Sequence, residues 1–565
     1  MWRRVLRYGT LAYLSCFELL RRALGRRAPY GVLKLDISGE LSEQTVTYRV
    51  PGLLPRSRDD YFSLLAVLRL AREDPQLRGV LIRCGELHTG WAKVQELRRN
   101  VELLRAAGRT VWVVLNRAGI REYVLASAAD RVIVAPAATL ELTGLSTEVT
   151  FLAGTLEKLG IKAELVQMGK YKSAAESFTR SAMSAAHQEM VESLLHDLYE
   201  QVVEAIAVGR GMEHDAVVAL LDRGPFLARE ALNLRLVDDV LYEDEAEEKL
   251  RELCDHAKVI EAPDHFRRRG RTVRLDVLRR GGPLIGVVHM TGTIKMDDSI
   301  AGPERVSACG VSSVCRDLQE LRERPDVGAV VLRISSPGGS GLASDLIWHE
   351  VSRLRQHKPV VVSFGDVAAS GGYYIAVAGG PVFAEGGTIT GSIGVLAGKA
   401  LLRGLYERIG VTKQIITRGR HAALYSDYVP LGDEERQRMQ AEAQSFYSDF
   451  LDKVCAGRKL SRDAVSAVAE GRVWTGRQAL ARGLIDTIGG FEAALAQAKT
   501  LLGLDPRALV GVERYPKPRR LWRLALNLSA QQSRMMAMWP TVWPSLHFVT
   551  AERVWAVLPF EFRFF

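Results

Sequence analysis

The chain contains an internal duplication, and this repeat constrains its fold more than any other feature. Residues 71–83 (AREDPQLRGVLIR) align with residues 321–333 (LRERPDVGAVVLR), an offset of 250 positions. The same offset relates Tyr123 to Tyr373, and it changes by only two positions toward the end of each copy. A register kept over about 150 residues is the signature of tandem homologous units.

The duplication divides the 565 residues, which are too many for one hydrophobic core, into five segments. We expect a basic and apolar N-terminal helix (1–29), a first domain (30–260), an arginine-rich linker (261–283), a second domain (284–503) and an aromatic-rich tail (504–565).

Within each copy, short apolar runs alternate with segments of helical periodicity. The runs GVLIR and TVWVVL in the first copy and AVVLRI and PVVVSF in the second are typical of strands buried on both faces. Alternation of such strands with helices predicts two α/β domains with mostly parallel sheets.

The net charge of +10 comes from 76 Lys and Arg against 66 Asp and Glu. Arginines concentrate near residues 265–282 and in the first 27 residues, while the other charges are mixed in sign and show no nucleic-acid-binding signature. We therefore expect a solvated linker and no nucleic-acid partner. The six cysteines form no CxxC pair and no metal-site spacing with histidine, so no metal is expected.

The apolar stretch at residues 8–20 contains Glu18 and is shorter than the ~20 residues of a transmembrane helix. It is either a basic amphipathic helix in the membrane interface or a helix packed on the protein. The tail holds four of the nine tryptophans, which suit a membrane interface or a subunit contact: Trp522, Trp539, Trp543 and Trp555.

The two copies differ in polar residues that follow their strands. The first buried strand of the second copy ends in Ser-Ser-Pro-Gly-Gly, with Gly338 as the first glycine, and the first copy lacks this motif. Glycines after a parallel strand can direct backbone N–H groups into an oxyanion hole, although a plain turn uses the same residues.

Ser370 follows the second strand of the second copy, in Ala-Ala-Ser-Gly-Gly-Tyr-Tyr, whereas the first copy has Ile120 there. A serine at a strand-to-helix turn can project its hydroxyl from the sheet edge, with the N–H of Gly371 ready to bind an oxyanion. The alternative is a serine that caps the helix.

The candidate base for Ser370 is a lysine of the other copy. No histidine lies between Ser370 and His421, and lysine is another known base for a serine nucleophile. Lys172, in Gly-Lys-Tyr-Lys-Ser-Ala, aligns with Ala422. Each copy has thus lost the residue that the other kept. Although most single lysines are simply exposed, this pattern predicts a composite site between the copies.

A lysine base must be neutral, yet at a reference pKa of ~10.4 only about one lysine in 2,500 is neutral at pH 7. Burial that lowers the pKa by ~2 to 3 units is therefore required of Lys172. Ser392, in Thr-Gly-Ser-Ile-Gly, could orient the amine, or it could belong to a polar turn.

These motifs resemble, in order and spacing, those of the bacterial signal peptide peptidases (SppA) of the Ser/Lys type, in the long form with two tandem domains. The resemblance covers about residues 30–503. It implies that Ser370 is the nucleophile and Lys172 the general base. It also implies that Gly338 and Gly371 give oxyanion N–H groups and that Ser392 contacts the lysine.

The resemblance further implies a ClpP/crotonase-like fold and a serine endopeptidase that degrades cleaved signal peptides and other short apolar peptides without a cofactor. Such enzymes form membrane-associated homo-oligomers, and the resemblance suggests a tetramer at the bacterial inner membrane with its body on the extracytoplasmic side. Two alternatives are a crotonase-type acyl-CoA enzyme, which would need neither Ser370 nor Lys172, and a non-catalytic membrane scaffold.

Overall fold

A computed structural model describes residues 30–43, 47–48, 56–57, 61–296, 308–517 and 554–557. The expected N-terminal helix at residues 1–29 lies outside the described residues, and so do Trp522, Trp539 and Trp543.

The first copy and the linker contain the following elements: β1 (Val32–Gly39), β2 (Thr47–Tyr48), β3 (Arg56–Ser57), α2 (Tyr61–Glu73), β4 (Gly79–Leu87), α3 (Trp91–Ala106), β5 (Thr110–Leu115), α4 (Ile120–Ala126), β6 (Arg131–Val134), β7 (Thr139–Leu140), α5 (Ala153–Leu159), β8 (Lys162–Met168), the 3₁₀ turn η1 (Ser173–Ala175), α6 (Glu176–Thr179), α7 (Ala185–Arg210), α8 (His214–Leu221), β9 (Phe226–Leu227), α9 (Ala228–Asn233), β10 (Asp239–Val240), α10 (Glu243–Leu253), β11 (Val259–Glu261) and α11 (Ala262–Arg280).

The second copy and the tail contain β12 (Leu284–Thr291), β13 (Thr293–Lys295), β14 (Ala308–Gly310), α12 (Val311–Glu323), β15 (Val327–Ser336), β16 (Gly338–Ser340), α13 (Gly341–Arg355), β17 (Val360–Ala369), α14 (Gly371–Ala376), β18 (Val382–Ala384), β19 (Ile389–Gly391), β20 (Val395–Leu401), α15 (Arg403–Arg408), α16 (Asp433–Arg458), α17 (Arg462–Val468), β21 (Val473–Thr475), α18 (Gly476–Ala481), β22 (Thr487–Ile488), α19 (Phe491–Leu501), β23 (Gly511–Tyr515) and β24 (Val554–Val557).

Each copy is built on its own sheet, as the alternating pattern predicts. The first sheet has the order β10-β6-β5-β4-β1-β11 and is parallel throughout. The second has the order β21-β19-β17-β15-β12-β23, with β18 paired to β17 and β22 paired to β18, and among its described pairs β19–β21 is the antiparallel one. The two copies therefore have the expected α/β fold with mostly parallel sheets.

The second sheet extends past the expected boundary at residue 503, because β23 pairs with β12 just as β11 pairs with β1. Two elements thus close the two sheets in equivalent positions. The short strand β23 was not predicted because its alternation of polar and apolar residues is typical of an edge strand, not of the buried runs elsewhere.

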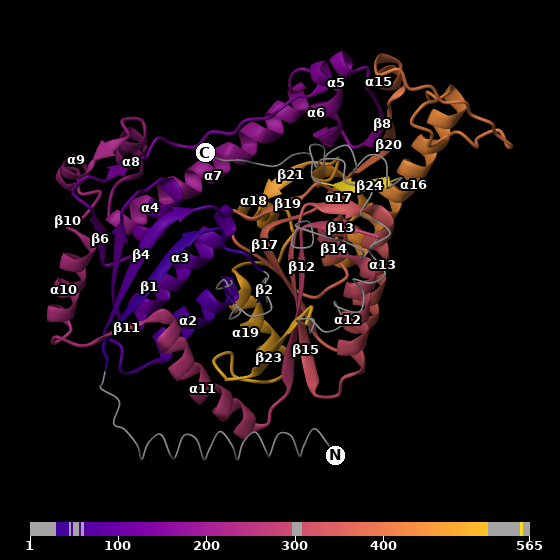
Figure 1. Cartoon of the computed structure of the whole chain (residues 1–565). Helices are drawn as coiled ribbons and strands as arrows, with labels where there is room; N and C mark the ends of the chain where they lie inside the picture. Colours follow the sequence, from indigo (N-terminus) through magenta and orange to yellow (C-terminus); the bar gives the residue numbers. More distant parts are fainter. Residues whose placement is uncertain are drawn as a thin grey trace.

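The two copies share a hydrophobic core. Helix α19 of the second copy packs on β15 and β17, and residues of α2 and α3 from the first copy belong to the same buried cluster. The rings of Phe62 and Phe491 lie 4.8 Å apart across this junction. Figure 1 shows the two sheets side by side, with α7 crossing from the first copy to the second.

A third sheet joins the copies directly. Its order is β14-β13-β16-β24-β20-β8, so that β8 of the first copy lies in the same sheet as five strands from the second copy and the tail. Strands β8 and β20 pair antiparallel over their whole length, from Lys162 opposite Leu401 to Met168 opposite Val395. This pairing fixes the position of the segment that follows β8.

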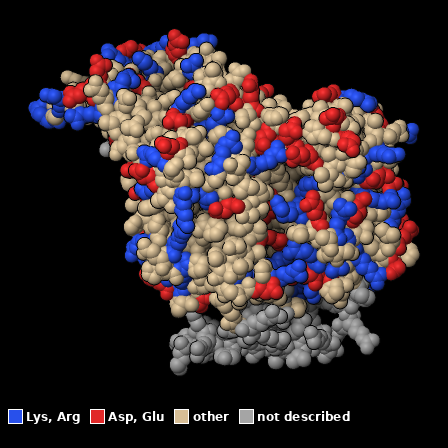
Figure 2. All heavy atoms as spheres, turned by 180° about the vertical axis from the view of Figure 1, so that it is seen from behind, with Lys and Arg blue, Asp and Glu red and all other residues tan. Residues whose placement is uncertain are grey.

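The arginine-rich linker is the helix α11, which contacts α2 and β23 and so bridges the copies. None of the helices in the described ranges is both long and apolar enough to cross a bilayer. On the face seen in Figure 2, basic and acidic side chains are interspersed over the body and the protruding arm. The arm is formed by α15 and the loop that leads to α16 (Figure 1).

Candidate active site

Ser370 lies in the turn between β17, which ends at Ala369, and α14, which begins at Gly371. Its backbone has φ of 53° and ψ of −114°, a strained conformation for a residue with a side chain. Its hydroxyl makes no capping hydrogen bond to the helix. Ser370 thus occupies the N-cap position of α14 without capping it through its side chain, and the strained turn leaves the hydroxyl available for another contact.

Lys172 of the first copy provides that contact. Its Nζ lies 2.7 Å from Ser370 Oγ, 2.9 Å from Ser392 Oγ and 3.2 Å from the Ser392 carbonyl oxygen. All three residues have an exposed fraction of 0%. The structure thus brings together a hydroxyl and an amine that are 198 positions apart in the chain.

A turn at residues 470–472 holds the lysine segment in place. The backbone N–H of Tyr171 donates to the Glu470 carbonyl at 2.7 Å, and a Cβ added at Gly471 would lie 2.5 Å from Lys172 N. Gly471 also has φ of +75°, so that only glycine fits here without a shift. The sequence reasoning missed this turn, for which the only signal was one glycine beside charged residues.

Burial lowers the pKa of Lys172 well below its usual value, and desolvation is the cause. The polar partners of its amine are hydroxyl and carbonyl oxygens, not carboxylates, so no negative charge offsets the loss of water. The amine is thereby favoured in the neutral form that can accept a proton.

The candidate oxyanion donors lie beside Ser370. Gly371 is the first residue of α14, where backbone N–H groups lack partners within the helix. Gly338 begins β16, and its N–H donates to Ser336 Oγ at 3.1 Å. An oxyanion bound at Gly338 must share or replace that hydrogen bond. Gly338 has φ of +101°, a conformation that favours glycine.

A buried ion pair also crosses between the copies. Arg333 of β15 donates to Glu43 at 2.8 Å, and both side chains are about 1% exposed. Burial alone would raise the pKa of Glu43, but the nearby cationic side chains, Arg333 first and then Lys93, outweigh it, and the pKa falls to about 2. Glu43 lies in a loop of the first copy, and no sequence pattern marked it.

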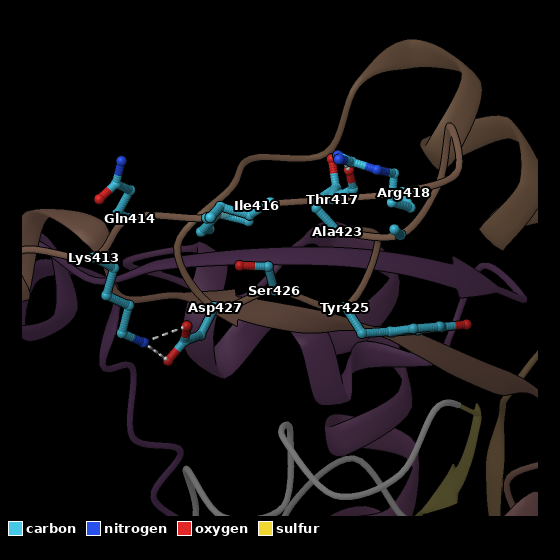
Figure 3. Close-up of a pocket in the computed structure, with 11 residues that line it drawn as sticks. Lys413, Gln414, Ile416, Thr417, Arg418, Ala423, Tyr425, Ser426 and Asp427 are labelled. Atoms are coloured by element: carbon cyan, nitrogen blue, oxygen red, sulfur yellow. Dashed lines mark hydrogen bonds and ion pairs between the residues drawn. The ribbon is translucent and has the colours of Figure 1, made fainter.

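An open surface pocket of about 570 Å³ lies in the arm, away from these residues. It is lined by residues of the loop at 413–427, with a Lys413–Asp427 ion pair at one end (Figure 3). Ala422, which aligns with Lys172, is exposed in this loop. The equivalent segments of the two copies therefore have different environments, one buried and one open to solvent.

Both copies match a known peptidase family. The model of peptidase family S49 matches residues 104–257 and 352–505, one segment in each copy and together more than half of the chain. The chain belongs to peptidase family S49. One relative of this S49 chain is Serine protease SPPA, chloroplastic, of Arabidopsis thaliana, which is 34% identical over 83% of this chain and 68% of the relative. Another is Protease 4 of Haemophilus influenzae, which is 28% identical over 84% of this chain and 79% of the relative.

Among solved structures, ClpP1 of Listeria monocytogenes is similar, with 15% identity and a TM-score of 0.23 over 36% of this chain and 91% of that one. Membership in family S49 makes the chain a serine-type endopeptidase with two tandem copies of the family domain. The acyl-CoA enzyme and scaffold alternatives receive no support from the relatives found.

Proposed function

We propose that this S49 peptidase cleaves peptides with Ser370 as nucleophile and Lys172 as general base. The observation that carries the proposal is the buried 2.7 Å contact between Lys172 Nζ and Ser370 Oγ. A nucleophile and a base within hydrogen-bond reach, with the base held by a third group, form the arrangement that nucleophilic catalysis needs. Ser392 is that third group.

The reaction follows from these positions. The neutral amine of Lys172 takes the proton of Ser370 as Oγ attacks the peptide carbonyl, and the N–H groups of Gly338 and Gly371 stabilise the oxyanion. The resulting ammonium gives its proton to the leaving amine as the C–N bond breaks, which leaves an acyl-enzyme. Water, deprotonated by the same amine, then attacks the ester, and the proton returns to Ser370 as the acid leaves.

We further propose that the substrates are cleaved signal peptides and other short apolar peptides, and that the chain forms a homo-oligomer at a membrane. Exposed apolar side chains on and beside the arm support self-association, including Ile416 (83% exposed) and Ile409 (61%). The basic and apolar sequence of residues 1–29 supports membrane attachment. A reporter fused after residue 30 tests the proposed extracytoplasmic location of the body.

Labelling with a fluorophosphonate tests the Ser–Lys assignment. We expect the intact chain to be labelled at Ser370 and the Lys172→Ala chain to lose labelling, because its serine has no base. Lys170→Ala is the matched control, since Lys170 is an exposed lysine two positions away and its removal should leave labelling intact. Labelling of Lys172→Ala at the rate of the intact chain would exclude Lys172 as the base.

A further inference from the structure

Strand β24 of the C-terminal tail lies between two strands that both lead to the candidate site. On one side it pairs antiparallel with β16, which begins at the oxyanion glycine Gly338. On the other side it pairs antiparallel with β20, which starts three positions after Ser392. The outer edges of both strands are already paired, with β13 and β8.

Without β24, the facing edges of β16 and β20 would be unpaired and about 10 Å apart, which is the width of one inserted strand. Such a slot is suited to an extended peptide, because main-chain hydrogen bonds can form along both of its sides. In this structure residues 554–557 of the same chain occupy the slot.

The direction and register of β24 lead its carboxyl end toward the candidate site. From Val554 opposite Ala397 to Trp555 opposite Leu396, the strand advances along β20 toward Ser392. Along β16 it advances from Trp555 opposite Ser340 to Val557 opposite Gly338. Both registers thus lead the carboxyl end of β24 to the candidate catalytic groups, with Val557 beside the oxyanion glycine.

We propose that β24 is an intramolecular pseudosubstrate: the Val-Trp-Ala-Val segment occupies the substrate slot, and a peptide must displace it before Ser370 can act. The inference rests on the proposed function, because it takes Ser370 and Gly338 as the reacting centre. It goes further by naming the occupant and the class of peptide that replaces it, an extended apolar segment bound antiparallel to both β16 and β20.

A chain truncated after Lys517 tests the proposal. Because residues 518–553 tether β24, its effective concentration at the slot is on the order of millimolar. We expect truncation to raise kcat/KM for a short apolar peptide about tenfold or more, through a lower KM with little change in kcat. Equal kcat/KM in the two chains would overturn the proposal.

A substitution within the complete chain guards against an indirect effect of truncation. Ala556→Pro removes a backbone N–H from β24 opposite Gly339, and proline is not tolerated in a strand paired on both sides. We expect this variant to behave like the truncated chain. Ala537→Pro is the matched control, the same change in the same tail outside β24, and it should behave like the intact chain. Equal activation by both variants would contradict a specific strand contact.

A peptidyl phosphonate, which fills the slot and reacts covalently with an active serine, separates failure of this inference from failure of the proposed function. Faster labelling of Ser370 in the truncated chain, slowed again by a synthetic peptide of residues 551–565, is the expected result. Equal labelling rates overturn the pseudosubstrate alone. If Ser370 remains unlabelled in both chains, the nucleophile assignment fails, and the inference fails with it.

Discussion

The two copies use one architecture for different purposes. The first copy has Ile120 at the position of Ser370. In the second copy, the segment equivalent to the one that carries Lys172 is an exposed loop around Ala422. The repeated sheets therefore supply the frame, whereas the site depends on β8 and β20, which pair between the copies. Neither copy alone contains both reacting groups.

The largest effect that we expect comes from moving the lysine. Lys172→Ala should lower kcat/KM by at least ~10³-fold, as removal of a base that activates a nucleophile does. Adding Ala422→Lys should restore nothing, because a lysine there is solvated, keeps its ordinary pKa and lies outside the buried cluster. Peptidase assays of the single and double variants measure this. Rescue by Ala422→Lys would mean that the copies are interchangeable.

The repeat also contains an equivalent pair of arginines, Arg333 and Arg83, in different surroundings. Arg333 is buried against Glu43, whereas Arg83 is 43% exposed and pairs with Asp36 at the surface. We expect Arg333→Met to destabilise the protein by about 3–5 kcal/mol, because Glu43 stays buried and loses the guanidinium that contacts it, with Lys93 left as a more distant cation at 4.0 Å. Arg83→Met should cost about 0–1 kcal/mol. Urea denaturation midpoints distinguish the two, and equal shifts would contradict the difference in burial.

Two glycines with the same φ allow a finer test of how the lysine is positioned. Gly471 and Gly410 both have φ of +75°, but only at Gly471 would a Cβ meet Lys172, while nothing lies within 4 Å at Gly410. Gly471→Ala should therefore lower kcat by about 10²-fold, the loss expected when a catalytic group is displaced by about 1 Å. Gly410→Ala should cause only local backbone strain. Similar losses of kcat in both variants would show that strain, not contact with Lys172, matters.

Much of the frame could be predicted from the sequence because its signals are local and repeated. Buried strands such as β4 and β15 are continuous apolar runs, and each recurs at the same offset. The turn of Ser370 was visible because its signal is also local: small residues that follow a buried strand. The loss of one functional residue from each copy predicted that the site lies between them.

The contacts that assemble the site had no comparable signal. The pairing of β20 with β8 on one side and β24 on the other joins segments far apart in sequence, and strand pairing depends on partners that a local pattern does not name. Glu43 is one acidic residue in a loop, and its partner Arg333 looks the same in sequence as Arg83. Burial distinguishes these residues, and burial is a property of the assembled fold.

A pH dependence of kcat/KM is expected from Lys172, which has no counterpart in the second copy. Burial lowers the pKa of Lys172, so the ammonium form, which cannot act as a base, predominates only below that lowered value. Below it, kcat/KM should rise about tenfold per pH unit, and above it kcat/KM should level off at a pH below 10.5.

The lowered pKa of Lys172 also predicts how the stability of the protein depends on pH, and this prediction can be tested without measuring activity. Between the lowered pKa and 10.5 the unfolded chain binds the proton that the folded chain releases, so the free energy of unfolding should increase as pH rises through that window. Lys172→Met removes the titrating group and should flatten this part of the profile, while Lys170→Met, at an exposed position, should leave it unchanged. If the free energy of unfolding of both variants depends on pH as steeply as that of the parent, Lys172 is not desolvated. The buried lysine of one copy would then be chemically equivalent to a lysine in the open loop of the other.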